Sequence, residues 1–235
     1  MTLKPIPFSK YDDTGAYHWD ECERYSRRYN PPLEARYRAI AKRITQASRV
    51  LDVGCGDGYL MSLVSPRCGQ VLGIDTELTG VKLAASKLRQ FPNCNVTWAS
   101  SYELPFRDRC FEVVLLADVI EHLENPGTCL REIVRVMATD GMLFVTTPKR
   151  QPARPLGWGH VKEYTPGELI ECLRSYFAEV CTTFFWPSTW FSLYGTKVGW
   201  RLIRLFARYC YNPFVEEGPD HEDYDQILAI CSHPH

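Results

Sequence analysis

Three glycines at alternate positions, Gly54, Gly56 and Gly58, directly follow a short apolar run and carry the clearest chemical signal in the chain. The run from 50 to 53 reads as a buried strand, and helical spacing resumes after the third glycine. Glycines in such a turn let the backbone bend sharply and approach a ligand that a Cβ atom would block. The pattern therefore predicts a crevice for a nucleotide-like ligand at the end of this strand.

The spacing of the glycines indicates which kind of ligand the crevice takes. A dinucleotide-binding loop reads G-x-G-x-x-G, whereas here the third glycine comes one residue early, and Asp57 would place a carboxylate beside a pyrophosphate. Asp75 ends a second apolar run about twenty residues further on, where a carboxylate can accept hydrogen bonds from both hydroxyls of a ribose. Loop and acid together favour a nucleoside that carries a cationic or zwitterionic group instead of phosphates.

Two histidines are candidates for proton transfer. His122 follows the predicted fourth strand and lies beside the crevice, where it either shuttles a proton or only packs on a helix face. His160 lies in a stretch from 149 to 164 without periodicity, and long irregular stretches inside compact domains are often functional. We prefer His160 as the general base or acceptor-orienting group, and a histidine bonded only to loop backbone is the alternative.

Beyond its glycine loop, the chain resembles the class I S-adenosylmethionine-dependent methyltransferases of small molecules, including those of ubiquinone biosynthesis. The resemblance covers residues 48–150 and runs through four motifs in the family's order. These are the glycine loop at 50–58, Asp75, the loop that contains Leu104-Pro105-Phe106, and the segment 118–126 after the fourth strand. The resemblance implies S-adenosyl-L-methionine as the cofactor and S-adenosyl-L-homocysteine as the product.

The resemblance also implies which residues contact the cofactor. The glycine loop would lie against the methionine and ribose portions, and the exit of the third strand would flank the adenine. Most relatives have an aspartate at that exit, where this chain has Ser100, an uncharged hydrogen-bonding residue. The expected cofactor-binding residues are Asp52, Gly54, Cys55, Gly56, Gly58, Asp75, Thr76, Ser100, Ser101, Ala117 and Asp118.

The composition restricts the class of protein and of partner. The chain has 235 residues, 45% hydrophobic and 23% charged, which suits one ordinary globular domain. Its formal net charge of -1 gives no field that would attract nucleic acid. The 10 cysteines are scattered without a C-x-x-C motif and no signal peptide is recognisable, so we expect free thiols in the cytoplasm and no metal site.

Strand and helix patterns alternate regularly and predict an α/β fold. We expect a doubly wound, Rossmann-like sheet of seven strands, mainly parallel with an antiparallel edge strand. The single methyltransferase domain would comprise an N-terminal helical cap (1–47), the cofactor-binding core (48–150) and an acceptor-side part (151–235). No apolar run approaches the ~18 residues that a membrane-spanning helix needs.

The cap and the irregular stretch supply aromatic residues. Within the cap we expect a loosely held arm at 1–16 and helices at 17–30 and 33–47, with the prolines after residue 30 ending the first helix. These helices either cover one edge of the sheet or form a lid over a substrate. The candidate substrate-binding residues are Tyr17, Trp19, Trp158 and Tyr164.

An unusual insertion, residues 187–224, precedes the final strand. On a helical wheel its cations form a narrow stripe beside a wide apolar face. The stripe consists of Lys197, Arg201, Arg204 and Arg208. Such a helix suits packing on the core with solvated arginines, a lid over an apolar substrate, or peripheral membrane contact through residues 195–211.

Methyl transfer from S-adenosylmethionine to a small aromatic or apolar acceptor is the function that these observations favour. An oxygen acceptor is the first choice, and a carbon or nitrogen of a quinone-like, lipid-like or other small molecule is the alternative. A nicotinamide-dependent oxidoreductase would need the longer glycine spacing. A non-catalytic S-adenosylmethionine-binding module on the same scaffold stays open.

Overall fold

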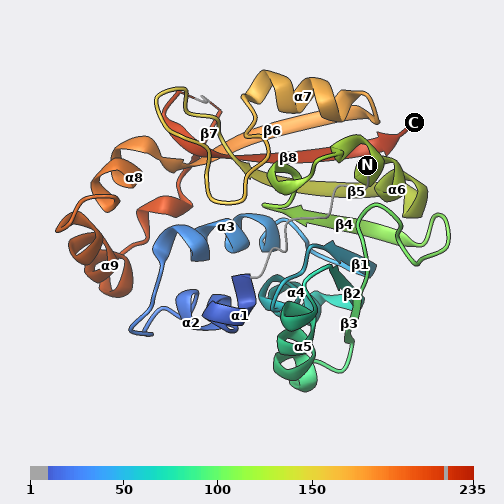
Figure 1. Cartoon of the computed structure of the whole chain (residues 1–235), viewed down its shortest axis with the longest axis horizontal. Coiled ribbons are helices and arrows are strands. Elements are labelled where there is room, and N and C mark those ends of the chain that lie inside the picture. Colours follow the sequence, from blue (N-terminus) through green and yellow to red (C-terminus); the bar gives the residue numbers. More distant parts are fainter. Residues whose placement is uncertain (1–9, 220–221) are drawn as a thin grey trace, which may run out of the picture.

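The computed structural model describes residues 10–219 and 222–235 and is built on an eight-stranded sheet (Figure 1). Its strands are β1 (Ala47–Val53), β2 (Cys68–Asp75), β3 (Cys94–Trp98), β4 (Phe111–Ala117), β5 (Met137–Pro148), β6 (Phe177–Pro187), β7 (Glu217–Gly218) and β8 (Tyr224–Pro234). They lie in the order β3-β2-β1-β4-β5-β8-β6-β7. The sequence predicts seven strands, and the additional one is the two-residue β7, which pairs with the end of β6.

The strand directions confirm the predicted fold class. β1 pairs in parallel with β2 and β4, β2 with β3, and β4 with β5. β8 lies antiparallel between β5 and β6. The strand order reverses between β1 and β4, and doubly wound sheets bind ligands outside the carboxyl ends of their strands at such a point. The glycine loop follows β1 directly, so the topology places it there.

Helices cover both faces of the sheet. They are α1 (Lys10–Thr14), α2 (Tyr17–Glu21), α3 (Pro31–Ala41), α4 (Tyr59–Val64), α5 (Leu78–Lys87), α6 (Pro126–Val136), α7 (Pro166–Arg174), α8 (Ser188–Tyr194) and α9 (Gly199–Tyr209). Short 3-10 turns are η1 (Ser65–Arg67), η2 (Leu88–Gln90), η3 (Ile120–His122) and η4 (Pro213–Val215). Side chains of α3, α4 and α5 form one hydrophobic cluster with the sheet, and side chains of α6 and α7 form another.

Strand β4 shows how the two clusters share the sheet. Val113 and Leu115 belong to the cluster with α3, α4 and α5, whereas Val114 and Leu116 belong to the cluster with α6 and α7. All four side chains are buried, because successive residues of a strand point to opposite faces. This burial on both faces is what a continuous apolar run in a central parallel strand predicts.

The first predicted helix is shorter than expected. It ends at Glu21 and not at residue 30, and Pro31, which we expected to terminate it, instead begins α3. The Asn30 side chain caps α3 by accepting a hydrogen bond from the backbone N–H of Leu33 (3.4 Å). Proline suits this first turn because the N–H that it lacks would have had no helical partner there.

The predicted arm is partly helical. Its residues 10–14 form α1, whereas residues 1–9 lie outside the described residues. The Tyr11 side chain is buried, so tertiary contacts hold a helix too short to be stable by itself. The second predicted helix, 33–47, ends earlier, at Ala41.

The irregular stretch 149–164 forms neither helix nor regular strand, as predicted. Its ends meet in an isolated parallel bridge between Lys149 and Tyr164. The chain then enters α7 through a capping box in which the Thr165 and Glu168 side chains each accept from the other's backbone N–H. The stretch is therefore a closed loop that starts and ends at the carboxyl end of β5.

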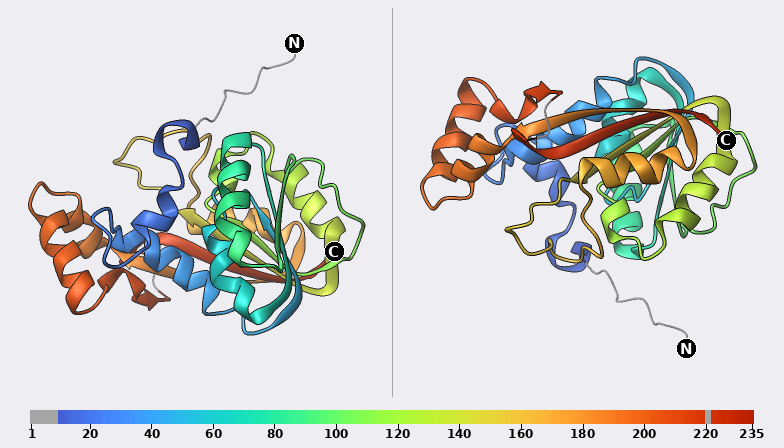
Figure 2. Two further views of the ribbon diagram at one scale, coloured as in Figure 1. Left: turned by 90° about the horizontal axis from the view of Figure 1, so that it is seen from below. Right: turned by 90° about the horizontal axis from the view of Figure 1, so that it is seen from above.

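The insertion forms α8, α9, η4 and β7, and Figure 2 shows α8 and α9 at one end of the molecule, away from β3 and α5. Its small core contains Ile203 and Phe214 together with Ala35 of α3. Within the described parts of the chain, no helix combines the length and the apolar character that crossing a bilayer requires.

The cationic stripe of α9 is divided in the structure. Arg204 and Arg208 donate hydrogen bonds to backbone carbonyls in the turn at residues 24–27. Lys197 and Arg201 are exposed. The interpretation of a packed helix with solvated arginines therefore holds for half of the stripe, because the other half faces the protein.

Candidate functional site

The glycine loop has the backbone conformation that its sequence requires. Gly54, Gly56 and Gly58 have φ of 78°, 54° and 77°, a left-handed region that L side chains rarely adopt. The N–H groups of Gly54 and the next residue both donate to the Ile74 carbonyl (2.8 and 2.9 Å), which ties the loop to the end of β2. A Cβ atom on Gly54 would collide with the Val119 side chain. The loop therefore combines left-handed turns with close packing.

Asp75 lies at the carboxyl end of β2, facing this loop. Its two carboxylate oxygens accept hydrogen bonds from the N–H groups of Gly56 (2.8 Å) and Glu77 (2.7 Å). Each oxygen keeps a further lone pair. Burial raises the pKa of Asp75, and the backbone hydrogen bonds lower it in part. The position suits the predicted contact with two ribose hydroxyls, which stays a prediction.

Three other residues predicted at the cofactor differ in their surroundings. Burial and the charge of Asp75 raise the pKa of Asp52 to about 8, and its Oδ2 atom has no hydrogen-bond partner among the described residues. Cys55 is buried, which raises the pKa of its thiol. Thr76 is exposed, and its carbonyl accepts from the Trp98 indole N–H (2.9 Å). Of these side chains, Asp52 has unused hydrogen-bonding capacity that a ligand could satisfy.

The exit of β3 lies beside Asp75, because the Ala99 N–H donates to the Asp75 carbonyl (3.1 Å). The Ser100 hydroxyl accepts from the Tyr102 N–H (3.1 Å). The Ser101 side chain hydrogen-bonds the Cys129 thiol on α6, while burial raises the pKa of that thiol to about 12. The two serines therefore occupy the predicted edge of the crevice, and their contacts with adenine stay predictions.

The N-terminal cap closes over the glycine loop. The Tyr11 N–H donates to Glu77 Oε1 (2.6 Å), and the Tyr11 ring lies against both Gly56 and Gly80. Helix α1 therefore bridges the glycine loop and the turn before α5. The two interpretations of the predicted helices, a cover for one sheet edge or a lid over a substrate, stay predictions; α3 packs on the sheet, and α1, from the predicted arm, lies over the glycine loop.

Asp57 attaches the cap to the glycine loop. Its side chain is fully buried, and its oxygens accept from the backbone N–H (3.0 Å) and Nδ1 (2.9 Å) of His18. The Trp19 indole N–H donates to the Asp57 carbonyl (2.9 Å). Burial is the largest influence on His18 and lowers its pKa. The sequence used Asp57 as an argument against a pyrophosphate ligand, and the structure shows that its carboxylate is bonded to α2.

Ala117 ends β4, and the next residue, Asp118, has a φ of 51°. Strained backbone of this kind clusters at functional sites. The Asp118 carboxylate accepts from the Thr146 hydroxyl (2.7 Å) and the Gln226 amide (2.7 Å) and forms an ion pair with Arg36 of α3. The cap is therefore joined to the fourth strand exit as well as to the glycine loop.

Sequence reasoning missed Arg36, although a signal was present. It falls three residues after Leu33 and four before Ile40, on the face of α3 that we expected to be apolar. A cation on a buried face requires an acidic partner, because burying an unpaired charge is costly. The sequence therefore indicated that Arg36 needs an acidic partner, but it could not identify Asp118 as that partner.

The two candidate histidines meet at the exits of β4 and β5. Their rings are in edge contact, with centroids 4.9 Å apart. Between them and the sheet lies Glu121, which the sequence analysis did not single out. Its Oε2 atom accepts from the Thr147 hydroxyl (3.0 Å), and burial raises its pKa well above the ordinary value. Burial also lowers the pKa of His122, so His122 is neutral near pH 7.

The four predicted substrate-binding residues do not form one cluster. Trp19 packs against Tyr59 and belongs to the cluster with α3, α4 and α5, whereas Tyr164 is buried in the cluster with α6 and α7. The sheet separates these two clusters. Tyr17 is buried and its ring lies tilted against that of the neighbouring His18, while Trp158 is 69% exposed. Their contacts with a substrate stay predictions, and Trp19 and Tyr164 pack in different clusters.

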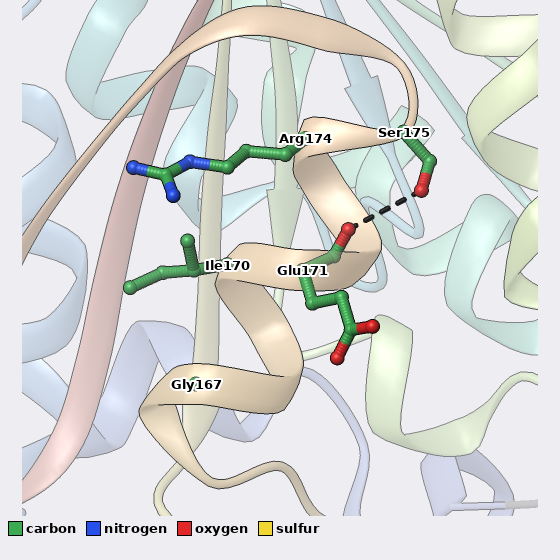
Figure 3. A pocket seen from close by; sticks show the side chains of 5 residues that line it. All are labelled: Gly167, Ile170, Glu171, Arg174 and Ser175. Carbon is green, nitrogen blue, oxygen red and sulfur yellow. Dashed lines mark hydrogen bonds between the residues drawn. The ribbon is translucent and has the colours of Figure 1, made fainter.

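A surface hollow on α7 lies apart from these groups (Figure 3). It is lined by Gly167, Ile170, Glu171, Arg174 and Ser175. The Ser175 hydroxyl donates to the Glu171 carbonyl (3.3 Å), so the hollow belongs to one helix and the residue after it. A second hollow is lined by α3, α4 and the end of β6. Neither includes a glycine-loop residue or a candidate histidine.

Comparison with known proteins identifies the core. Residues 51–145 match the model of a methyltransferase domain. A Mycobacterium tuberculosis protein named "Probable S-adenosylmethionine-dependent methyltransferase" is 36% identical over 142 residues, which cover 58% of this chain and 50% of that protein. A ubiquinone biosynthesis O-methyltransferase of Rhodopseudomonas palustris is 30% identical over 167 residues, 63% of this chain and 64% of that protein. The chain therefore spans about half the length of the first of these relatives.

Solved structures share the fold. The N-methyltransferase NodS from Bradyrhizobium japonicum, in complex with S-adenosylhomocysteine, has a TM-score of 0.63 at 17% identity and covers 94% of this chain and 99% of its own. The [4+2]-cyclase SpnF has a TM-score of 0.64 at 22% identity and covers 86% of this chain and 82% of its own. Likenesses at such identities establish the fold alone.

Proposed function

The chain carries a methyltransferase domain of the class I S-adenosylmethionine-dependent family, and on this premise we propose that it transfers a methyl group from S-adenosylmethionine to an oxygen of a small aromatic or apolar acceptor. The sulfonium of this cofactor supplies an electrophilic methyl carbon. The protein then has to hold the cofactor, align the acceptor and remove the acceptor's proton.

The observation that carries this proposal is the junction of the glycine loop with Asp75. The carboxylate is held in place by two backbone N–H groups, one of them from Gly56, so the loop and the acid form a single rigid edge of the crevice. A nucleoside that binds there would meet the carboxylate with its ribose. Glycine-loop backbone would approach the rest of the ligand without a Cβ atom in the way.

The acceptor would lie one strand further along the same edge of the sheet. His122 and His160 meet at the exits of β4 and β5, adjacent to the switch point between β1 and β4. Both Nδ1 atoms are bonded to the protein, that of His122 to the Gly159 carbonyl (2.9 Å) and that of His160 to Glu163 (2.8 Å), so Nε2 of His160 is the atom that would meet an acceptor hydroxyl. Either histidine, and His160 first, would orient that hydroxyl or take its proton.

Two alternatives remain for the experiment to decide. The acceptor atom could be a carbon or nitrogen, and the chain could bind its cofactor without transferring the methyl group. The similarity to a cyclase shows that this fold does not by itself determine the reaction. The positions of the candidate histidines favour an acceptor that loses a proton, which is the reason for preferring oxygen.

Calorimetry followed by a transfer assay tests the proposal. We expect saturable binding of S-adenosylmethionine and S-adenosylhomocysteine and none of NAD. Transfer of a labelled methyl group to a panel of phenols, matched anilines and quinone precursors then identifies the acceptor atom. Binding of NAD alone would refute the cofactor assignment, and binding without transfer to any class would favour the non-catalytic alternative.

We also propose that the insertion contacts an anionic membrane surface through residues 195–211. The outer face of α9 exposes Leu202, Leu205 and Tyr209 (61%, 57% and 68%). Arg201 of α9 and Lys197, which precedes the helix, are exposed cations in the same segment. A large exposed apolar face beside cations suits a helix that lies in the headgroup region of anionic lipid.

Co-sedimentation with vesicles tests this contact. Vesicles rich in phosphatidylglycerol should retain the protein, and Leu202→Asp with Leu205→Asp should release it. The control is Leu78→Asp, which places an acid at an exposed position in the first turn of α5, where the helix dipole tolerates it. Equal retention of all variants would exclude this helix as the contact.

A further inference from the structure

We propose that Glu121, His122 and His160 bind a divalent transition-metal cation of the zinc class. Each residue offers one ligand atom, and these atoms lie within 4.8 Å of one another. The sequence predicts no metal site, because its cysteines show no C-x-x-C spacing. The inference rests on the proposed methyl transfer to oxygen and names what activates the acceptor.

The two histidines are held in the manner of metal ligands. The Nδ1 atom of His122 bonds the Gly159 carbonyl, and that of His160 bonds a carboxylate oxygen of Glu163. A carbonyl or carboxylate at Nδ1 fixes the tautomer in which Nδ1 carries the proton and Nε2 the lone pair. Metal-binding histidines almost always have such a partner on the second nitrogen.

Glu121 brings a buried oxygen that lacks a partner. The residue is 1% exposed, and its Oε1 atom has no hydrogen-bond partner among the described residues, whereas Oε2 accepts from Thr147. A buried carboxyl oxygen without a partner destabilises the protein. A cation between the carboxylate and the two imidazoles would give this oxygen its missing contact.

The segments that carry the ligands are fixed to each other. The N–H groups of Val161 and Lys162 both donate to the Glu121 carbonyl (2.8 and 3.1 Å). Glu163, which orients His160, also accepts from the Gly157 N–H (2.8 Å). The loop after β5 is thus attached by its backbone to η3. Ligands from distant parts of the sequence are held together before any ion arrives.

The donor set indicates the class of ion and its use. Two imidazoles and one carboxylate are a set that catalytic zinc sites use, with a further position left open for substrate. An acceptor hydroxyl at that position would become more acidic, as water does on zinc. Its proton would leave to solvent, and an oxygen lone pair would form the new bond to the methyl carbon. The electron pair of the breaking carbon–sulfur bond would return to sulfur.

Cobalt(II) titration of the full chain after chelator treatment tests the site directly. We expect saturable binding of one ion with visible absorption bands typical of nitrogen and oxygen ligands, and competition by Zn²⁺. His160→Ala and Glu121→Gln should each weaken binding at least tenfold; the glutamine variant keeps the size of the buried side chain. The control, His233→Ala, removes an exposed histidine on β8 and should bind as the parent does.

Two outcomes would refute the metal site and leave the proposed methyl transfer uncontradicted. One is the lack of saturable Co²⁺ binding by a folded protein that binds S-adenosylmethionine. The other is methyl transfer that is unchanged by chelation yet lost in His160→Ala, which would make His160 a general base. Conversely, Co²⁺ binding that depends on the three residues, with no transfer to any acceptor, would support the site and refute the function.

Discussion

The cofactor crevice and the proposed acceptor side of this molecule are assembled in different ways. The crevice is built from neighbouring stretches, the glycine loop and Asp75, which are joined backbone to carboxylate. The acceptor side brings His160 to Glu121 and His122 across a long irregular loop, and the contacts that fix this loop are backbone hydrogen bonds to η3. A recurrent local motif specifies the first region, whereas tertiary packing specifies the second, where methyltransferases of different substrates need to differ.

The cap connects the two regions. His18 fastens it to Asp57 in the glycine loop, and Arg36 fastens it to Asp118 at the exit of β4. The cap therefore contacts both the glycine loop and the exit of β4. Variants that disturb only one of these regions should separate binding from turnover.

The largest effect is expected in the crevice. Gly56→Arg should abolish binding of S-adenosylmethionine in calorimetry, a loss of at least a hundredfold, because Gly56 has a φ of 54° and its Cβ would collide with Tyr11. Gly167→Arg on α7 is the matched control, since a Cβ there meets nothing within 4 Å. Near-normal affinity of the Gly56 variant would refute the assignment of this loop.

A substitution on the proposed acceptor side should reduce turnover and leave cofactor binding unchanged. His160→Ala should reduce turnover about a hundredfold, the usual contribution of a group that moves or orients a proton, with the cofactor dissociation constant unchanged. Both quantities are measured with the acceptor that the transfer panel identifies. An unchanged rate would remove His160 from the mechanism, and a matching loss of cofactor affinity would contradict the separation of the two regions.

The link between cap and sheet should dominate stability. Arg36→Met leaves the Asp118 carboxylate without its cation at a mostly buried site, and breaking such a pair costs about 3 kcal/mol. Arg28→Met is the control, because its ion pair with Asp20 is exposed at both ends and such a pair is worth less than about 1 kcal/mol. Urea denaturation measures both, and equal losses would argue against a special role for the link to Asp118.

The smallest effect concerns pH. Burial holds the pKa of His18 in the folded protein below its ordinary value of 6.5. At a pH between the folded pKa and 6.5, the unfolded chain therefore binds a proton at His18 that the folded protein does not bind. Stability from this residue is complete above pH 6.5 and falls as the pH decreases below it, by roughly 1.4 kcal/mol per unit until the folded pKa is reached. His18→Gln removes this titration, so its melting temperature should fall less between pH 7 and 5. If the melting temperatures of the variant and the parent fell equally with pH, the lowered pKa of His18 would be contradicted.

The sequence alone was sufficient to predict features that depend on a few neighbouring residues. Three alternate glycines after an apolar run specify left-handed turns at a strand exit, and the continuous run of β4 specifies a strand buried on both faces. Repeated strand–helix alternation then limits the fold to a doubly wound sheet. The long irregular stretch could be located because it lacks any period.

Residues whose partners lie far along the chain could not be assigned in this way. The sequence offered no tertiary partner for Asp57 or Trp19, and solvated arginines were one of its three alternatives for α9. The structure bonds Asp57 to His18, packs Trp19 on α4 and turns two arginines onto the segment after α2.

The sequence by itself determined the sheet, the cofactor loop and the approximate position of His160, because backbone conformation and hydrophobic period act over a few residues. Only the tertiary structure decided that Glu121 joins both histidines and that Arg36 meets Asp118. Such pairings depend on which buried polar group finds a partner, and that choice is made by the packing of segments that are distant in the chain.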